Sequence, residues 1–251
     1  MTLPRTPSFR LDGRRALVPG GSRGIGLACA AALAEAGAHV VLCARTESEV
    51  EAAVAALRNA GHGADGGTLD VSDLDALDAF LDAHGPFDIL CNSAGLARHA
   101  PALDTTPEDF DAVVGLNLRA AYFLAQRVAR RMEAGGVILQ ISSQMGHVGG
   151  IDRAVYAATK HGVEGMTKSM AIEWGPRNIR VNTICPTFIR TPLTAATFAD
   201  PERRAWIDRM IKLPRVAEVE DLMGAVAFLA SDAAAMITGT ALLVDGGWTA
   251  D

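Results

Sequence analysis

The chain has 251 residues, of which 49% are hydrophobic and 21% charged, and its net charge at pH 7 is −6. A chain of this size buries a sizeable core, and its acidic balance, without a basic stripe or arm, excludes nucleic acid as a partner. Cys29, Cys43, Cys91 and Cys185 form no C-x-x-C pair and the histidines show no metal-ligand spacing, so we expect neither disulfides nor a metal. With no signal-peptide core and no apolar run of membrane-spanning length, we expect a cytoplasmic protein without a membrane partner.

Apolar and amphipathic runs follow one another and predict alternating strands and helices. In chain order these are a strand at 15–19, a helix at 24–36, a strand at 39–44, a helix at 47–59, a weak strand at 64–69, a helix at 74–83, a strand at 87–91, one long helix or two joined ones at 107–133, a strand at 137–141, a helix at 154–174, a strand at 179–184, a helix at 221–230 and a strand at 241–244. Continuously apolar strands separated by helices are typical of a parallel sheet covered on both faces. The sequence therefore predicts an α/β fold, a doubly wound Rossmann-type three-layer sandwich with about seven parallel strands.

One segment, at about 186–214, departs from the short connections elsewhere. It is long and polar, and we interpret it as a mobile cover over a site rather than as a structural element. No composition break, repeat or low-complexity tract divides the chain. We therefore expect residues 1–251 to form a single domain that carries this cover.

A glycine-rich run lies between the first predicted strand and the first predicted helix. It reads Gly20-Gly21-Ser22-Arg23-Gly24-Ile25-Gly26. Glycines permit a tight turn and a close backbone approach to a pyrophosphate, and a helix N-terminus adds free N–H groups and a positive dipole end. The spacing differs from G-x-G-x-x-G, and a simple tight turn is the alternative. The position between strand and helix favours a dinucleotide site.

The end of the second strand bears on the choice of cofactor. An acidic residue there would bind the ribose 2′-hydroxyl of NAD(H), but the strand ends at Ala44 and Arg45 follows. Arg45 can clamp a 2′-phosphate with charge-assisted bonds, and Arg23 can reach the same space. For either arginine alone, a solvated surface charge is as good an interpretation as a phosphate-binding residue. Together they predict that NADP(H) is preferred over NAD(H).

Tyr156 and Lys160 lie four residues apart in a helical stretch and so share one face. An ammonium close to a phenol favours the phenolate, which makes the tyrosine usable as an acid and base. A lone Y-x-x-x-K is common by chance. Ser142 and Ser143 favour a catalytic role for this pair. They end the fifth predicted strand, and ligand sites lie off the carboxyl ends of parallel strands.

With these motifs, the sequence resembles the short-chain dehydrogenase/reductase family, in its branch of about 250 residues, from about position 10 to the end. The motifs in common are the glycine-rich loop, Asp70-Val71, Asn92-Ser93-Ala94-Gly95, the tetrad Asn117, Ser143, Tyr156 and Lys160, and the nicotinamide segment with Pro186, Thr187, Ile189 and Thr191. The resemblance implies an NAD(P)-binding domain in which Asp70-Val71 holds the adenine and Asn92, Ala94 and Gly95 line the cofactor.

The resemblance also implies the catalytic roles. Ser143 would hydrogen-bond the substrate oxygen, and Tyr156 would give or take its proton. Lys160 would hold the nicotinamide ribose and assist Tyr156, and Asn117 would position a water that relays protons through Lys160. Without the resemblance, Asn117 reads as a polar residue inside a helix that bonds to backbone.

Three positions depart from the family pattern. Pro19 replaces the usual threonine before the first glycine, so one N–H and the threonine's side-chain bonds are lost. Ser93 replaces the second asparagine of N-N-A-G. Thr187 replaces the glycine after Pro186 and puts a side chain near the nicotinamide. None removes a catalytic group, so they affect cofactor positioning rather than the class of reaction.

The sequence leaves the substrate open. We expect Gln144, His147, Arg153 and Arg190 near it. The stretches at 221–224 and 245–248 resemble relatives that act on sugar acids and polyols, which favours a small polar substrate. A 3-oxoacyl thioester reductase is the alternative within the enzyme class, and a catalytically inactive dinucleotide-binding regulator is the alternative from another class.

Assembly is the last expectation. The helices at 107–133 and 154–174 carry apolar residues on more than one face, and an apolar face in water favours a partner. These residues are Val113, Leu116, Leu118, Phe123, Leu124, Val155, Val163, Met166, Met170 and Ile172. We expect a homotetramer, with a second interface from 221–244 and with Trp248 reaching a neighbour. Packing of both faces within one subunit is the alternative.

Overall fold

A computed structural model describes residues 1–250 and all their side chains other than that of Leu193. Its sheet has seven strands in the order β3-β2-β1-β4-β5-β6-β7, and every neighbouring pair is parallel. The strands are β1 (Arg15–Pro19), β2 (His39–Ala44), β3 (Ala64–Thr68), β4 (Ile89–Asn92), β5 (Gly136–Ile141), β6 (Ile179–Pro186) and β7 (Ala241–Val244). The predicted doubly wound α/β fold is confirmed. The strand order reverses between β1 and β4, the point where such sheets bind ligands.

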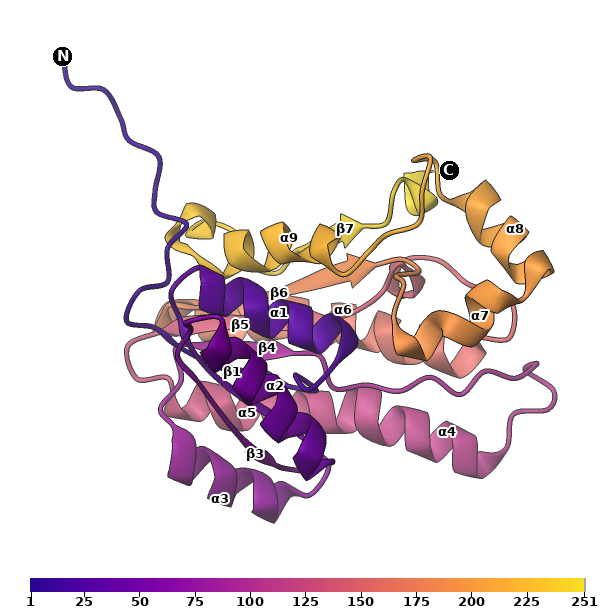
Figure 1. Cartoon of the computed structure of the whole chain (residues 1–251), viewed down its shortest axis with the longest axis horizontal. Coiled ribbons are helices and arrows are strands. Elements are labelled where there is room, and N and C mark those ends of the chain that lie inside the picture. Colours follow the sequence, from indigo (N-terminus) through magenta and orange to yellow (C-terminus); the bar gives the residue numbers. More distant parts are fainter. Residues whose placement is uncertain (251) are drawn as a thin grey trace.

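Two layers of helices cover the sheet (Figure 1). The longer helices are α1 (Gly24–Glu35), α2 (Glu47–Asn59), α3 (Leu74–His84), α4 (Pro107–Val114), α5 (Ala121–Arg131), α6 (Ala154–Trp174), α8 (Pro201–Met210) and α9 (Glu220–Ala230), and α7 is short (Ala195–Ala199). Helices α1, α2 and α9 pack on one face and α3, α5 and α6 on the other, each face with its own buried apolar cluster. The residues predicted to bind the cofactor and to act in catalysis therefore lie on or next to elements that pack on the sheet with one side buried.

The predicted helix at 107–133 is interrupted by a π-helical turn. This turn, Gly115–Ala120, joins α4 to α5 and carries Asn117. Turns of this kind are common at functional sites, because the wider turn redirects a side chain. The buried Asn117 at its centre is 2% exposed.

The expectation that 186–214 lacks structural elements is wrong. Residues up to Pro186 belong to β6, and α7 and α8 follow within the segment. The side chain of Asp200 caps α8 by accepting bonds from the backbone N–H groups of Glu202 and Arg203, and Pro201 occupies the first turn. Helix α8 is polar and buries one residue, Ile207, so it shows almost no apolar period in the sequence. Both helices lie at the end of the molecule toward which β6 and β7 point (Figure 1).

No helix within residues 1–250 is both long enough and apolar enough to cross a membrane.

Candidate active site

The glycine-rich loop brings backbone atoms together at distances that side chains would prevent. Gly20 has a left-handed φ of 73°, and a Cβ there would lie 2.9 Å from the backbone of Ser93. A Cβ at Gly26 would lie 1.9 Å from the carbonyl oxygen of Gly20. Helix α1 has no side-chain cap, since Arg23 at its N-cap makes no such bond. Its first N–H groups are therefore available to a phosphate.

Pro19 keeps the loop attached to its neighbours despite the missing N–H. Its carbonyl accepts from the Ser93 N–H at 3.0 Å, and the Gly20 N–H donates to the carbonyl of Cys43 at 2.8 Å. The departure from threonine at Pro19 therefore leaves the register between β1, β2 and the loop after β4 intact.

A residue that the sequence analysis missed, Glu49, lies in the first turn of α2 beside the predicted 2′-phosphate site. It accepts from Ser22 Oγ at 3.1 Å and from Arg23 Nη1 at 3.0 Å. The Arg23 side chain is 71% exposed, and Arg45 is exposed at the end of β2. Glu49 thus holds the Ser22 hydroxyl and the Arg23 guanidinium together at this position.

The polar residues predicted to hold the adenosine half have local partners. Asp70 accepts from the Ser72 hydroxyl at 2.6 Å and from its N–H at 2.9 Å. These bonds, with a smaller contribution from Arg45, hold the pKa of Asp70 below its ordinary value. Val71 is buried. Asn92 donates to Gln140 at 2.8 Å and accepts from the Ala94 N–H at 3.1 Å, which fixes the turn before Gly95.

Two of the predicted catalytic side chains, Tyr156 and Lys160, lie close together on α6, and Lys160 reaches the end of β5. Lys160 Nζ donates to the carbonyl of Ile141 at 2.9 Å and lies 5.6 Å from the ring centroid of Tyr156. Ser143, two residues after Ile141, is 5% exposed. Its hydroxyl donates to Gln144 Oε1 at 2.6 Å and accepts from the Met145 N–H at 3.1 Å. The bond from Lys160 thus fastens the face of α6 that carries Tyr156 to the strand end that carries Ser143.

Asn117 bonds to backbone, as its sequence position alone indicates. Its Oδ1 accepts from the Leu96 N–H and its Nδ2 donates to the Leu96 carbonyl, both at 2.8 Å. A longer contact of 3.4 Å reaches Thr159 on α6. Asn117 therefore joins the π-turn to the loop after Gly95, directly beside the catalytic helix.

The nicotinamide segment contains a buried hydroxyl without a partner. Thr187 is 8% exposed, and its Oγ1 has no hydrogen-bond partner among residues 1–250. Such an orphaned group is destabilising unless a ligand satisfies it. A Cβ at Gly24 would lie 3.7 Å from Thr191, so Thr191 stands against the glycine loop. Together with the uncapped α1, these features fit a nicotinamide dinucleotide running from the glycine loop to Thr187.

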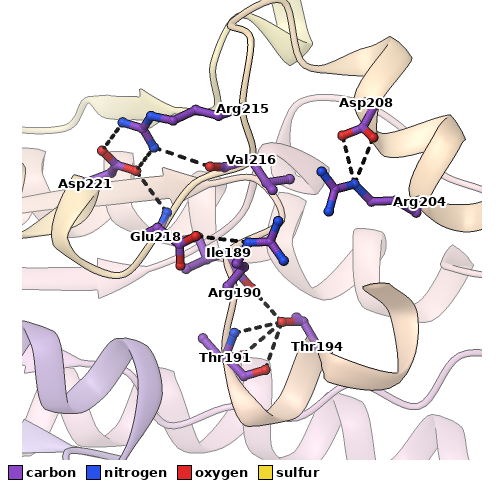
Figure 2. A network of polar contacts seen from close by, with 10 residues as sticks. All are labelled: Ile189, Arg190, Thr191, Thr194, Arg204, Asp208, Arg215, Val216, Glu218 and Asp221. Atoms are coloured by element: carbon purple, nitrogen blue, oxygen red, sulfur yellow. Dashed lines mark hydrogen bonds and ion pairs between the residues drawn. The ribbon is translucent and has the colours of Figure 1, made fainter. Parts of the chain in front are cut away.

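The two ends of the covering segment, residues 190–216, are tied together at its base (Figure 2). Ile189 pairs with Ala217 in an isolated parallel bridge, and Arg190 pairs with Glu218 at 2.9 Å. Asp221 then binds Arg215 through both oxygens at 2.6 and 2.7 Å. The Arg215 guanidinium is the main reason that the pKa of Asp221 falls from 3.8 to about 2. Arg190, expected near the substrate, is thus engaged at the base of the cover.

Aromatic and basic side chains gather on the substrate side of Tyr156. The His99 ring meets the Tyr156 ring edge-on at 5.7 Å. Arg153 hydrogen-bonds His99 Nε2 and stacks on Phe188 at 5.0 Å. Burial, with the nearby Arg153 and Arg203, lowers the pKa of His99 to about 4. His99 was not expected here, because nothing in its sequence neighbourhood indicates a site.

Trp248 does not reach a neighbour. It is 3% exposed and packs against Trp206 of α8 at 4.9 Å and Phe188 at 5.5 Å between ring centroids. This aromatic cluster connects the C-terminal turn to the covering segment within one chain. The expected role of Trp248 in an interface is therefore wrong.

His147 points away from this region into a buried polar cluster. Its Nε2 lies 3.5 Å from Cys185 Sγ and 3.9 Å from Glu164 Oε1. Glu164 accepts from the Thr183 hydroxyl at 2.8 Å and from the Cys185 thiol at 3.3 Å. The three ligand-type atoms lie within 4.8 Å of one another, a grouping that residues so far apart in sequence did not reveal. Burial, and next Glu164, raises the pKa of Cys185 to about 12, so the thiol acts here as a hydrogen-bond donor.

Comparison with known proteins gives this arrangement a family. A family model described as enoyl-(acyl carrier protein) reductase matches residues 20–249. D-erythrulose reductase of Gallus gallus is 40% identical over 96% of this chain and 98% of its own length. A gluconate 5-dehydrogenase of Burkholderia cenocepacia, solved with NADP and tartrate, is 38% identical with a TM-score of 0.93, and the match covers 98% of this chain and 99% of that one. The chain belongs to the short-chain dehydrogenase/reductase family.

Membership decides the class of reaction. The chain is an NAD(P)-dependent oxidoreductase that acts on CH–OH and C=O groups. Its similar relatives also include a gluconate 5-dehydrogenase of Gluconobacter oxydans, 38% identical over 96% of both chains.

Proposed function

We propose that this protein is an NADP(H)-dependent oxidoreductase that transfers a hydride between nicotinamide and an alcohol or ketone carbon of a small polar substrate of the sugar-acid or polyol type. The observation that carries the proposal is the bond from Lys160 to the carbonyl of Ile141. It holds Tyr156 and Ser143 on facing elements at the carboxyl ends of the strands.

The side chains divide the work as the family resemblance implies. Bound NADP(H) supplies or accepts the hydride. In the oxidation direction, the substrate carbon gives up its hydride while Tyr156 takes the hydroxyl proton; reduction runs the same step backwards. Ser143 exchanges its bond to Gln144 for a bond to the substrate oxygen. Lys160 holds the ribose and favours the anionic form of Tyr156, and Asn117 positions the water that passes the proton to solvent.

Cofactor binding is proposed for positions in several segments of the chain. These are Gly20, Ser22, Arg23, Gly24, Ile25, Gly26, Arg45, Asp70, Val71, Asn92, Ala94, Gly95, Tyr156, Lys160, Pro186, Thr187, Ile189 and Thr191. The preference for NADP(H) is supported by Ser22 and Arg23, which Glu49 holds together, and by the exposed Arg45 after β2 in place of an acidic residue. The relative solved with NADP is consistent with it.

The substrate proposal is supported by the relatives and by the site. Named relatives act on erythrulose, xylulose, threitol, gluconate and galactitol. His99 and Arg153 place polar groups beside Tyr156, where a 3-oxoacyl chain would require apolar ones. The intact set of Asn117, Ser143, Tyr156 and Lys160 disfavours an inactive regulator.

We also propose a cytoplasmic homotetramer. Of the apolar residues expected on the two helices, Val113, Leu124, Val163 and Met170 are buried within the chain, whereas Ile172 is 78% exposed. Tyr122 on α5 is 40% exposed, so an outer apolar face remains for a partner. Sedimentation at micromolar concentration tests this: a single species of 26.3 kDa would contradict it.

Turnover tests the proposed function. The purified chain is assayed with NADP(H) and NAD(H) against sugar acids, polyols and 3-oxoacyl thioesters. We expect turnover with a sugar acid or polyol and higher kcat/KM with NADP(H). Turnover restricted to thioesters, or a preference for NAD(H), would overturn the corresponding part of the proposal.

A further inference from the structure

Arg153 is a partly buried cation without an ion-pair partner in the described part of the chain. Among residues 1–250, no carboxylate oxygen lies within 4.0 Å of its guanidinium, and its Nε is buried without a hydrogen-bond partner. Burial is the largest influence on its pKa, which lies below the ordinary value. The stack on Phe188 stabilises the charge but occupies none of its N–H groups. A desolvated cation in this state is destabilising until an anion binds it.

The neighbouring acidic residues are engaged elsewhere. Arg203 of α8 lies 3.6 Å from Asp200 and 4.0 Å from Asp152. Both carboxylates pair with Arg203, and Asp152 also favours the charged form of Arg153 at longer range. In the described part of the chain, neither carboxylate forms a hydrogen bond or an ion pair within 4.0 Å with Arg153.

The hydrogen bonds around Arg153 leave one edge of its guanidinium without a hydrogen-bond acceptor among residues 1–250. Nη1 is bonded to His99 Nε2. Because His99 has a pKa of about 4, its ring is neutral near pH 7, so Nε2 accepts this bond and Nδ1 carries the proton. On the other edge, Nε is buried without a hydrogen-bond partner in the described part of the chain. Two parallel N–H groups on one edge match the two oxygens of a carboxylate.

The backbone directs Arg153 toward the reacting groups. Asp152 has a left-handed φ of 61°, a conformation that a non-glycine residue adopts at a local energetic cost. It turns the chain into α6. Arg153 precedes Tyr156 by three residues, so the two residues lie on the same side of the helix. His99 contacts both side chains, so Arg153 lies one side chain away from Tyr156.

We propose that Arg153 binds a carboxylate of the substrate, so that this enzyme prefers a hydroxy or keto acid over the uncharged polyol or ketose of the same carbon skeleton. The inference rests on the proposed function and narrows its substrate class. Arg153 acts as the anchor of the substrate end that does not react, and His99 holds the guanidinium in place.

The test compares two substrates that differ only in charge at one end. We would measure kcat/KM with NADP+ for D-gluconate and D-sorbitol in the wild type and in Arg153→Gln, Arg153→Lys and Arg204→Gln. Arg204 lies on α8 beside Arg203 but binds Asp208, and serves as the matched control. Removing one member of a desolvated charge pair leaves the other charge unpaired, so we expect Arg153→Gln to lower the gluconate-to-sorbitol ratio of kcat/KM on the order of 100-fold. Arg153→Lys keeps the charge without the paired N–H groups and falls in between.

A binding measurement separates failure of this inference from failure of the proposed function. Titration of the NADPH-loaded protein with tartrate, a hydroxy dicarboxylate that has no ketone to reduce, reports on the anchor without turnover. Equal loss of both substrates in Arg153→Gln, or unchanged tartrate affinity in a variant that keeps wild-type Tm and NADP+ affinity, overturns the carboxylate anchor and leaves the proposed function standing. If the wild type turns over neither substrate class, the proposed function fails, and weaker tartrate binding in Arg153→Gln but not in Arg204→Gln still supports the anchor.

Discussion

The two sides of this active site are built in different ways. The cofactor side, from β1 to the loop after β4, consists of backbone that is brought close by glycines and by an uncapped helix. The substrate side consists of long side chains, among them His99, Arg153 and Trp206, contributed by segments far apart in the sequence. In the proposed function, backbone contacts bind the cofactor, which is the same for every substrate. The side chains that contact the substrate are free to differ between relatives. The difference explains how one scaffold serves several sugar alcohols and acids among its relatives.

The largest expected effect lies where the two sides meet. Tyr156→Phe keeps the ring but removes the transferable proton, so we expect kcat to fall by about 10²–10⁴-fold with little change in NADP(H) affinity. Tyr122→Phe, at the other tyrosine of the chain, is the control and should retain activity. Near-normal turnover in Tyr156→Phe would show that the proton comes from another group.

The backbone character of the cofactor side is tested at Gly26. A methyl group there meets the carbonyl of Gly20 at 1.9 Å, and overpacking of this kind costs about 1–3 kcal/mol, or roughly tenfold to hundredfold in cofactor affinity. Gly224→Ala on α9 is the matched control, because its Cβ meets nothing within 4 Å. We expect that variant to bind NADPH normally and to be more stable by about 0.5–1 kcal/mol. Fluorescence titration with NADPH and thermal unfolding measure both; unchanged affinity in Gly26→Ala contradicts a backbone-built site.

The charged side chains proposed for the 2′-phosphate are tested at Arg45. Replacing Arg45 by Ala removes a charge-assisted bond of about 1.5–3 kcal/mol, so we expect kcat/KM for NADPH to fall roughly tenfold to hundredfold while that for NADH changes little. Ala44→Asp should shift the preference in the same direction. In Glu49→Gln, Arg23 loses its ion pair and becomes free for the phosphate, so the preference for NADPH should increase. An equal fall in kcat/KM for NADPH and NADH in Arg45→Ala would show that Arg45 does not bind the 2′-phosphate.

The smallest effect concerns the anchor of the cover on the substrate side. The pKa of Asp221 is depressed to about 2 by Arg215, so its stabilising contribution is present above the ordinary pKa of 3.8 and is lost as the pH falls through about 2. The Tm difference between wild type and Asp221→Asn should therefore be largest near neutral pH and shrink between about pH 4 and 2. We expect faster hydrogen exchange in 190–216 for this variant, and slower exchange in the wild type on NADP+ binding. Asp208→Asn, whose partner Arg204 lies within α8, is the control; a Tm difference independent of pH would contradict the role of Asp221.

The contrast between the two sides also explains which features of the molecule can be predicted from the sequence. Features that depend on consecutive residues can be predicted, and contacts between distant side chains cannot. The seven strands and most helices follow from apolar runs that alternate with amphipathic ones, and the glycine loop stands in consecutive residues. Helix α8 was missed because one buried residue, Ile207, leaves no apolar period. Glu49 and His99 carry no local signal, since their importance comes from partners at positions 23 and 153. The rotation of His147 toward Glu164 and Cys185 likewise depends on packing between β6 and α6.

The bridge between Ile189 and Ala217 bears on how this enzyme can be altered. Bridged strands lie about 4.8 Å apart, so the chain returns after α8 to nearly the same place where it left the end of β6. Everything between these points, including α7 and α8, is an excursion whose length enters the closure entropy only logarithmically. A homologous excursion from another member of the family can thus be grafted between these two positions, with new substrate contacts, provided that the graft keeps the threonine at 191 against the glycine loop.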